Sequence, residues 1–242
     1  MTAIQIDHLT KNYKDLTAVN DLSLTIEKGE LFSLLGVNGA GKTTTIKMLS
    51  CLTQPTSGDA TLHGKSITRE SAAVKAIIGV SPQETAVAPG LTARENLELI
   101  CGVHGFPKDR CNAKIAELTS LLGLEEILNR KAGKLSGGWQ RRLSIAMALI
   151  SEPEILFLDE PTLGLDVLAR SELWDVIRSL QGKVTIILTT HYMEEAEALS
   201  DRIGIMAGGK LLICDTPEAI KTATGAGTIE QAFVTIVKGV AK

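Results

Sequence analysis

Apolar and polar residues alternate through the first 30 positions of the chain. The alternation is clear in AIQID (residues 3–7) and LSLTI (residues 22–26), and it is typical of half-exposed strands in an antiparallel layer. Three later stretches are nearly continuous apolar runs, namely LFSLLG (31–36), ILFLDE (155–160) and VTIILTT (184–190). Runs of this kind predict strands that are buried on both faces of a sheet.

Helical spacing replaces the strand pattern in two parts of the chain. From Lys42, apolar residues recur every three or four positions up to Leu52, and QPTSGD then ends the pattern. Between about Thr92 and Gln181 helical periodicity dominates around one buried strand. Strands that alternate with helices indicate an α/β fold with a mostly parallel sheet, and the helix-rich middle indicates an inserted lobe.

We predict a single domain over residues 1–242. Its core, which includes the antiparallel β layer, takes about residues 1–83 and 151–242, and the helical lobe takes about residues 84–150. The cap-like Thr216, followed by a proline, predicts a helix in the tail. The shorter predicted elements are a hairpin at TLHGKSI (61–67), strands at IIGVSPQ (77–83), IGIM (203–206) and KLLIC (210–214), and a helix at MEEAEALSD (193–201).

Composition and charge narrow the possible functions. The chain is 44% hydrophobic and 22% charged, with a net charge of −3. Because it also has no run of five like charges, we expect no electrostatic binding to nucleic acid. Its four scattered cysteines lack metal-ligand spacing, which predicts reduced thiols in a reducing compartment. The N-terminus lacks a signal-peptide pattern and no window reaches the ~18 apolar residues of a membrane span. We therefore expect a cytoplasmic chain, unless a partner holds it at a membrane.

A glycine-rich loop lies between the strand predicted at LFSLLG and the helix that begins at Lys42. Its sequence, GVNGAGKT, fits GxxxxGK(S/T), in which the glycines let backbone N–H groups approach phosphate oxygens. Lys42 is expected to reach the β- and γ-phosphates, and Thr43 to offer a hydroxyl to Mg²⁺. A glycine turn without a ligand is the plain alternative. The predicted phosphate-binding residues are Gly36, Asn38, Gly39, Gly41, Lys42, Thr43 and Thr44.

Two acidic residues end the buried run ILFLDE, where ligands bind in open α/β sheets. Asp159 suits Mg²⁺, either directly or through water, and Glu160 suits a general base for water that attacks the γ-phosphate. The alternative is a solvated strand end. Because the guanine-reading pattern NKxD does not occur, ATP is favoured over GTP.

With LSGGWQRR (135–142) the sequence resembles the ATP-binding subunits of ABC transporters, over nearly the whole chain. The resemblance implies a P-loop NTPase core of RecA-like type and ATP with Mg²⁺ as ligands. The matching residues are Tyr13 for stacking on adenine, Gln83 for the Q-loop and its Mg²⁺ and water contact, Ser136, Gly137 and Gly138 for the signature, Leu163 to Asp166 for the D-loop, and His191 for the catalytic switch histidine.

The family resemblance explains why a second glycine-rich segment, Ser136-Gly137-Gly138, precedes a helix. Ser136 can cap that helix, and the first N–H groups of the helix then form another phosphate-binding surface. In the family this surface binds the γ-phosphate held on an opposite subunit, in a head-to-tail dimer that sandwiches two ATP molecules. We expect a homodimer.

Several of these residues have simpler interpretations. The alternatives are a packing aromatic for Tyr13, a loop-capping amide for Gln83, a solvated turn acid for Asp166 and a structural histidine for His191. The chain also departs from the family pattern at Trp139, where a polar residue is usual. Val167 likewise stands where proline is common after the D-loop.

The resemblance implies an active ATPase at the cytoplasmic face of a membrane, bound to separate integral-membrane permease subunits. Family members dock those subunits on the loop that follows Gln83, ETAVAPGLTARENL (84–97). The segment TLGLD (162–166) and the short C-terminal tail resemble those of ABC-2 type exporters. The sequence does not indicate which cargo is transported. Two alternatives stay open: a soluble ABC-type ATPase that acts as a mechanical switch, as in iron–sulfur assembly, and a nucleotide-dependent binding module without catalysis.

Overall fold

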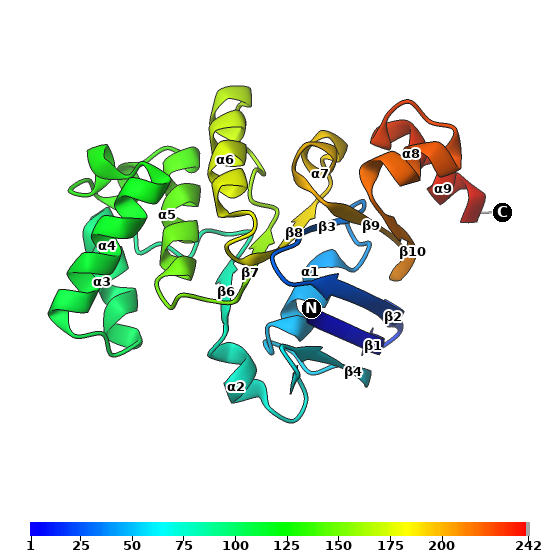
Figure 1. Cartoon of the computed structure of the whole chain (residues 1–242), viewed down its shortest axis with the longest axis horizontal. Helices are drawn as coiled ribbons and strands as arrows, with labels where there is room; N and C mark the ends of the chain where they lie inside the picture. Colours follow the sequence, from blue (N-terminus) through cyan, green and yellow to red (C-terminus); the bar gives the residue numbers. More distant parts are fainter. Residues whose placement is uncertain (241–242) are drawn as a thin grey trace. The chain divides into compact units, whose positions relative to one another are not determined.

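The computed structural model describes residues 1–240, which divide into two compact units. The first unit contains Met1–Lys75 together with the chain from Gln181, and the second is Ala76–Leu180. The sequence-based division into a core at residues 1–83 and 151–242 and a lobe at residues 84–150 stays a prediction. Each unit is described separately below, with the element labels of Figure 1.

The first unit has an antiparallel sheet in which β1 pairs with both β2 and β4. This arrangement confirms the antiparallel layer, although β1 and β2 extend well beyond the two alternating stretches. The hairpin predicted at residues 61–67 forms between β4 and β5. In sheet order these strands are β2 (Leu16–Glu27), β1 (Thr2–Tyr13), β4 (Ser57–Leu62) and β5 (Lys65–Ser66).

The buried strands of the first unit are mostly parallel. β3 pairs in parallel with β8 on one side and β9 on the other, and β10 pairs antiparallel with β9. Every residue of β3 and β8 is buried, as their apolar runs predict. In sheet order these strands are β10 (Lys210–Asp215), β9 (Arg202–Ala207), β3 (Leu31–Leu35) and β8 (Thr185–Thr190).

Helices pack on these strands through an apolar core that joins β3 and β9 to α7, α8 and α9. The Thr216 hydroxyl accepts a hydrogen bond from the Ala219 amide and Pro217 opens α8, so the predicted cap is confirmed. The first helix ends at Leu49 instead of Leu52, which is 67% exposed. The helices are α1 (Lys42–Leu49), α2 (Ser71–Lys75), α7 (Met193–Leu199), α8 (Pro217–Thr224) and α9 (Ile229–Val240).

The second unit is mainly helical, as the periodicity predicts, and its two parallel strands are β6 and β7. α3, α4 and α5 pack on one another and appear together in Figure 1. Its elements are β6 (Ile78–Ser81), α3 (Ala93–Val103), α4 (Lys108–Leu122), two 3₁₀ turns at Glu125–Ile127 and Ala132–Lys134, α5 (Gly137–Leu149), β7 (Ile155–Asp159) and α6 (Val167–Leu180). Among residues 1–240, no helix is both long enough and apolar enough to cross a membrane.

One glycine is required where β4 meets β1. Gly58 has a φ of +77°, and a Cβ there would lie 2.2 Å from the His8 carbonyl oxygen. Gly64 has nearly the same φ, +78°, but nothing lies within 4 Å of its Cβ position. Gly58→Ala should therefore lower the free energy of unfolding by about 3 kcal/mol, because the backbone must also shift, and Gly64→Ala by only about 1 kcal/mol.

Urea denaturation of the two glycine variants measures this difference. Equal destabilisation would contradict the prediction, because it would mean that the His8 backbone moves aside without a cost in free energy.

Candidate functional site

The predicted phosphate loop lies in the first unit, between β3 and α1. Gly41 forms the N-cap of α1 with a φ of 107°, and a Cβ there would lie 2.4 Å from the Ala18 carbonyl oxygen. Only glycine combines this backbone conformation with so close an approach. Asn38 and Gly39 are exposed at the tip of the loop. The loop therefore packs closely at its base and presents its tip to solvent.

Lys42 is almost completely buried, with 5% of its surface exposed. Its Nζ donates a hydrogen bond of 2.7 Å to the Gly36 carbonyl oxygen and a longer one, of 3.4 Å, to that of Val37. A buried ammonium group needs strong acceptors, and phosphate oxygens are stronger acceptors than carbonyl oxygens. Thr43 and Thr44 are half-buried in the first turn of α1. The lysine side chain thus folds back over the loop that the sequence assigns to phosphates.

His191 lies beside the same loop in the first unit. β3 and β8 are parallel, with Leu35 opposite Thr190, so both strands end at one edge. The Gly36 amide donates a hydrogen bond of 3.3 Å to the Thr190 carbonyl oxygen, immediately before His191. The imidazole is half-buried, and its centroid lies 4.2 Å from that of Tyr192. The first unit therefore brings together Lys42 and His191, which are far apart in the sequence.

Tyr13, the predicted adenine contact, is the last residue of β1. It is 44% exposed, and the Lys11 ammonium nitrogen lies 5.0 Å from the centroid of its ring. A cation at this distance interacts favourably with an aromatic face. Because much of the ring remains open to solvent, Tyr13 is not a core aromatic, and a planar base has access to it.

The two predicted acids lie in the second unit, at the end of the fully buried strand β7. Asp159 and Glu160 are each 5% exposed, and Glu160 has a φ of +49°. Positive φ at a residue other than glycine costs on the order of 1–3 kcal/mol and occurs preferentially at functional sites. In the parallel pair, Ser81 of β6 lies opposite Leu158 of β7, so the exposed Gln83 follows at the same edge of the strands.

The signature residues begin α5, also in the second unit. Ser136 is the N-cap residue, as predicted, but its side chain makes no capping hydrogen bond, so that part of the prediction is wrong. The N-cap backbone is extended, and the Ser136 side chain does not turn back to the helix amides. Gly137 and Gly138 lie against the D-loop and α6, since added Cβ atoms would meet Leu165 at 3.4 Å and Ala169 at 3.2 Å.

Asp166, the last D-loop residue, accepts a hydrogen bond of 2.9 Å from the Ala169 amide. It therefore stabilises the first turn of α6, as a turn acid would, while remaining exposed. Trp139 is half-buried on α5, with the Arg142 guanidinium 4.8 Å from its ring centroid. This cation–π contact gives the Trp139 ring a favourable neighbour at the position where the family pattern has a polar residue.

Arg141 was not predicted as a site residue, although it lies on α5 and is only 5% exposed. Its guanidinium donates hydrogen bonds of 2.6 Å and 2.7 Å to the carbonyl oxygens of Pro82 and Gln83. A signal was available, because Arg141 falls on the same helical stripe as the buried Ser144 and Ile145. The periodicity alone does not identify the distant backbone that this arginine contacts.

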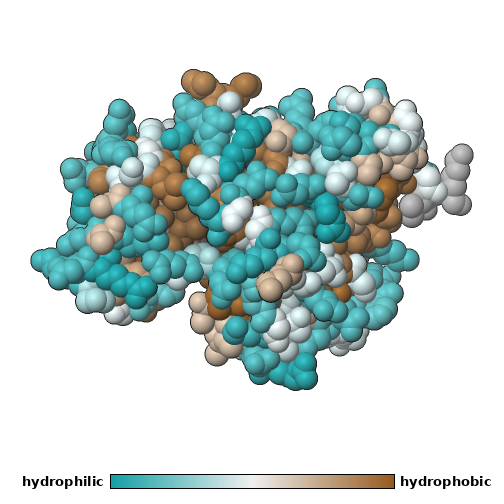
Figure 2. Space-filling model, viewed as in Figure 1, coloured by the Kyte–Doolittle hydropathy of each residue, from teal (hydrophilic) through white to brown (hydrophobic). Residues whose placement is uncertain are grey.

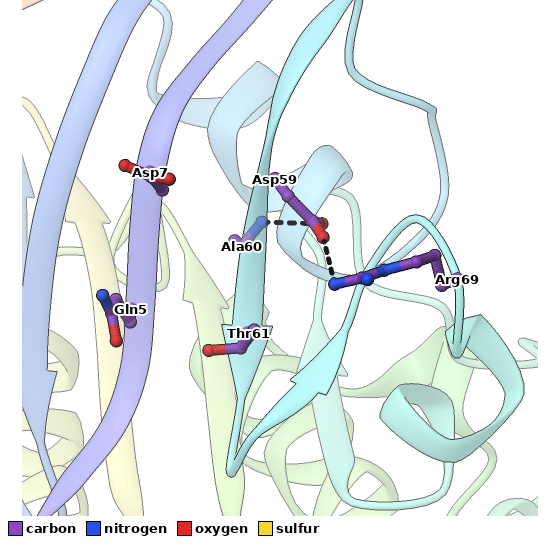
Figure 3. A pocket seen from close by; sticks show the side chains of 6 residues that line it. All are labelled: Gln5, Asp7, Asp59, Ala60, Thr61 and Arg69. Carbon is purple, nitrogen blue, oxygen red and sulfur yellow. Dashed lines mark hydrogen bonds and ion pairs between the residues drawn. The ribbon is translucent and has the colours of Figure 1, made fainter.

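Figure 3 shows a different pocket, on the antiparallel sheet of the first unit. Its volume is about 200 Å³, and it contains none of the predicted site residues. Partial burial alone would raise the pKa of Asp59, but the Ser66 hydroxyl and the Ala60 amide hold it below the ordinary value. Arg69 lies 3.5 Å from the same carboxylate. The charges of Asp59 and Arg69 are thus paired within the protein, so they do not indicate a bound ligand in this pocket.

Comparisons with known proteins identify the family of this chain. The profile of the family described as ABC transporter matches residues 19–163. The chain is 41% identical to the daunorubicin resistance ATP-binding protein DrrA3 of Streptomyces coeruleorubidus, over 95% of this chain and 73% of that protein. It is 40% identical to the phospholipid-transporting ATPase ABCA3 of Homo sapiens, over 94% of this chain but only 14% of that protein.

A solved structure has the same fold. It is the dimeric structure of a post-hydrolysis state of the ATP-binding cassette MJ0796, bound to ADP and Pi. The TM-score is 0.79 at 27% sequence identity, over 88% of this chain and 98% of that one. This likeness confirms the predicted P-loop NTPase fold.

Proposed function

Because this chain belongs to the ABC transporter family of ATP-binding domains, we propose that it hydrolyses ATP to power transport through separate membrane subunits. The observation that carries the proposal is the phosphate loop of the first unit. There the buried Lys42 lies over the loop, and the backbone of Gly36 is hydrogen-bonded to the strand that ends before His191.

Each site residue has a chemical task in this proposal. The loop amides and Lys42 bind the phosphates of ATP, and Tyr13 stacks on the adenine. Glu160 accepts the proton of the attacking water, and His191 contacts the γ-phosphate. The buried position and constrained backbone of Glu160 support the assignment of a group held in one orientation.

We further propose that Mg²⁺ accompanies ATP. Residues 1–240 contain no cluster of three His, Cys, Asp or Glu side chains suited to a metal ion. Mg²⁺ does not require such a cluster, because it usually keeps several waters and is held by one or two carboxylates together with phosphate oxygens. The Thr43 hydroxyl, the Asp159 carboxylate and the Gln83 amide oxygen supply such donors. When bound, the ion would neutralise charge on the phosphates.

The signature residues support a head-to-tail homodimer. Ser136 and Gly137 are exposed at the start of α5, so its first amides are open to a phosphate that this chain does not itself hold. Val167 and Leu168, which follow Asp166, are 80% and 71% exposed. Figure 2 shows hydrophobic surface protruding at one end of α6. Exposed apolar residues beside a phosphate-binding surface fit a subunit contact.

Docking of the membrane subunits is assigned to residues 84–97. Asn96 is fully buried and orders this loop, because its side chain donates to the carbonyl oxygens of Ala88 and Thr92 and accepts from the Ala88 amide. Leu99 and Val103 are exposed on the helix that follows. An ordered loop beside exposed apolar side chains suits a membrane partner that places this chain at the cytoplasmic face.

Export is the direction of transport that we favour. The names of two similar proteins, a daunorubicin resistance protein and a phospholipid-transporting ATPase, refer to drug resistance and lipid transport. The chain spans only 14% of the phospholipid-transporting ATPase. The cargo and partners of that protein are therefore not carried over to this chain. A soluble mechanical switch is not favoured, because the family and the names of these relatives point to transport.

A pull-down of this chain from native membranes, with and without ATP, tests the proposal. We expect a multi-span membrane protein of about six helices to be recovered. Recovery of a ribosome or a soluble scaffold instead would leave the ATP chemistry standing and overturn the transport function.

A further inference from the structure

Arg141 connects the signature helix to the Q-loop inside the second unit. Its two short hydrogen bonds end on consecutive carbonyl oxygens, those of Pro82 and Gln83. A guanidinium holds its donors in a rigid planar fork, so two bonds to neighbouring carbonyls fix the orientation of both peptide groups. The Gln83 side chain is exposed and leaves the backbone at this same peptide.

Two more contacts join α5 to the strand that leads into the Q-loop. The Ser144 and Ser81 hydroxyls are hydrogen-bonded at 2.9 Å, and both residues are buried. A Cβ on Gly79 would lie 2.3 Å from the Ala148 carbonyl oxygen, so β6 and α5 approach closely there. Arg141, Ser144 and Ala148 are spaced three and four residues apart, so they lie on one face of α5. That face holds β6 and the first Q-loop residues against the helix.

We propose that Arg141 is a positioning residue for Gln83. It holds the Q-loop backbone against the helix that carries Ser136, so the direction of the Gln83 side chain follows the orientation of the signature helix. A change at the signature would then reach Gln83 through one side chain within the second unit. The inference rests on the proposed function, because it gives Gln83 a contact with Mg²⁺ and water.

The first test is a double-mutant cycle between Arg141→Gln and Gln83→Ala in the full chain. If Arg141 acts through Gln83, Arg141→Gln should lower turnover and raise the Mg²⁺ concentration for half-maximal turnover, each by about tenfold. The double variant should then be no worse than Gln83→Ala, because effects of coupled residues do not add. Arg141→Lys keeps the charge but lacks the planar fork, so it should recover little of the loss. Additive effects, or no change in the Mg²⁺ dependence, would overturn the proposal.

Ser144→Ala is the matched control, because it breaks another contact between α5 and β6 without touching the Pro82 and Gln83 carbonyls. Its Mg²⁺ dependence should equal that of the unaltered chain. If Ser144→Ala reproduces the Arg141→Gln effect, general loosening of α5 explains both variants, and the positioning role is refuted.

A second measurement does not depend on catalysis. Amide hydrogen exchange of the segment 82–91, without nucleotide, should become about tenfold faster in Arg141→Gln and stay unchanged in Ser144→Ala. Unchanged exchange in Arg141→Gln would refute the positioning role whatever the turnover does. A chain that shows no ATP turnover at all would instead contradict the proposed function, and the exchange result would still decide the role of Arg141.

Discussion

Replacing Glu160 by glutamine should lower ATP turnover by about 10²-fold or more, which is about 2.7 kcal/mol of activation free energy. Glutamine has nearly the same shape as glutamate but cannot take a proton from the attacking water. The nucleotide contacts assigned to the first unit are unchanged, so ATP binding should persist, and ATP should shift the variant to a dimer. Phosphate release and light scattering measure the two effects.

Glu154→Gln is the control for Glu160, because it removes a charge from an exposed position just before the same strand. It should leave turnover within about twofold of the starting value. If Glu160→Gln hydrolyses ATP as fast as Glu154→Gln, a different group must position the water, and the general-base role is lost.

Replacing Lys42 by alanine should lower turnover by about 10²- to 10³-fold, with a loss of ATP affinity of at least about tenfold. The ammonium is the buried positive charge placed over the loop carbonyls, and alanine leaves the phosphates without it. Fluorescent-nucleotide titration and phosphate release measure binding and turnover separately. A melting curve shows whether loss of the hydrogen bond to Gly36 also loosens the loop.

Lys47→Ala is the matched control in the same helix. Lys47 is exposed in the last turn of α1, so its removal tests the effect of net charge without changing the loop. Both its ATP affinity and its turnover should stay within about twofold of the starting values. Unchanged affinity in Lys42→Ala would mean that the loop does not hold the phosphates, and the binding site would have to lie elsewhere.

The parts of the site that the sequence predicted well are local. The strand, glycine loop and helix around Lys42 are continuous in the chain, so a short pattern contains all the residues that shape the loop. The same holds for β7 and the two acids that end it. Both segments form as predicted, and the predicted family and fold are confirmed.

Two local predictions are wrong, and one short helix was not predicted. The apolar spacing extends the first helix to Leu52, whereas Cys51 adopts a φ of +56° and the helix has already ended. Ser136 occupies the N-cap as its residue type predicts, but the direction of its side chain depends on surroundings that the pattern does not contain. The short helix α2 has too few residues to show a period.

The sequence alone determined the family and predicted the phosphate and acid residues, because both depend on short motifs with fixed chemistry. Tertiary structure decided which distant residues meet. The parallel pairing of β3 with β8 places His191 beside the phosphate loop, and the Arg141 fork reaches Gln83 across 58 positions. Such strand pairs and buried hydrogen bonds form where distant parts of the chain are buried against each other. Only the folded chain brings those parts into contact.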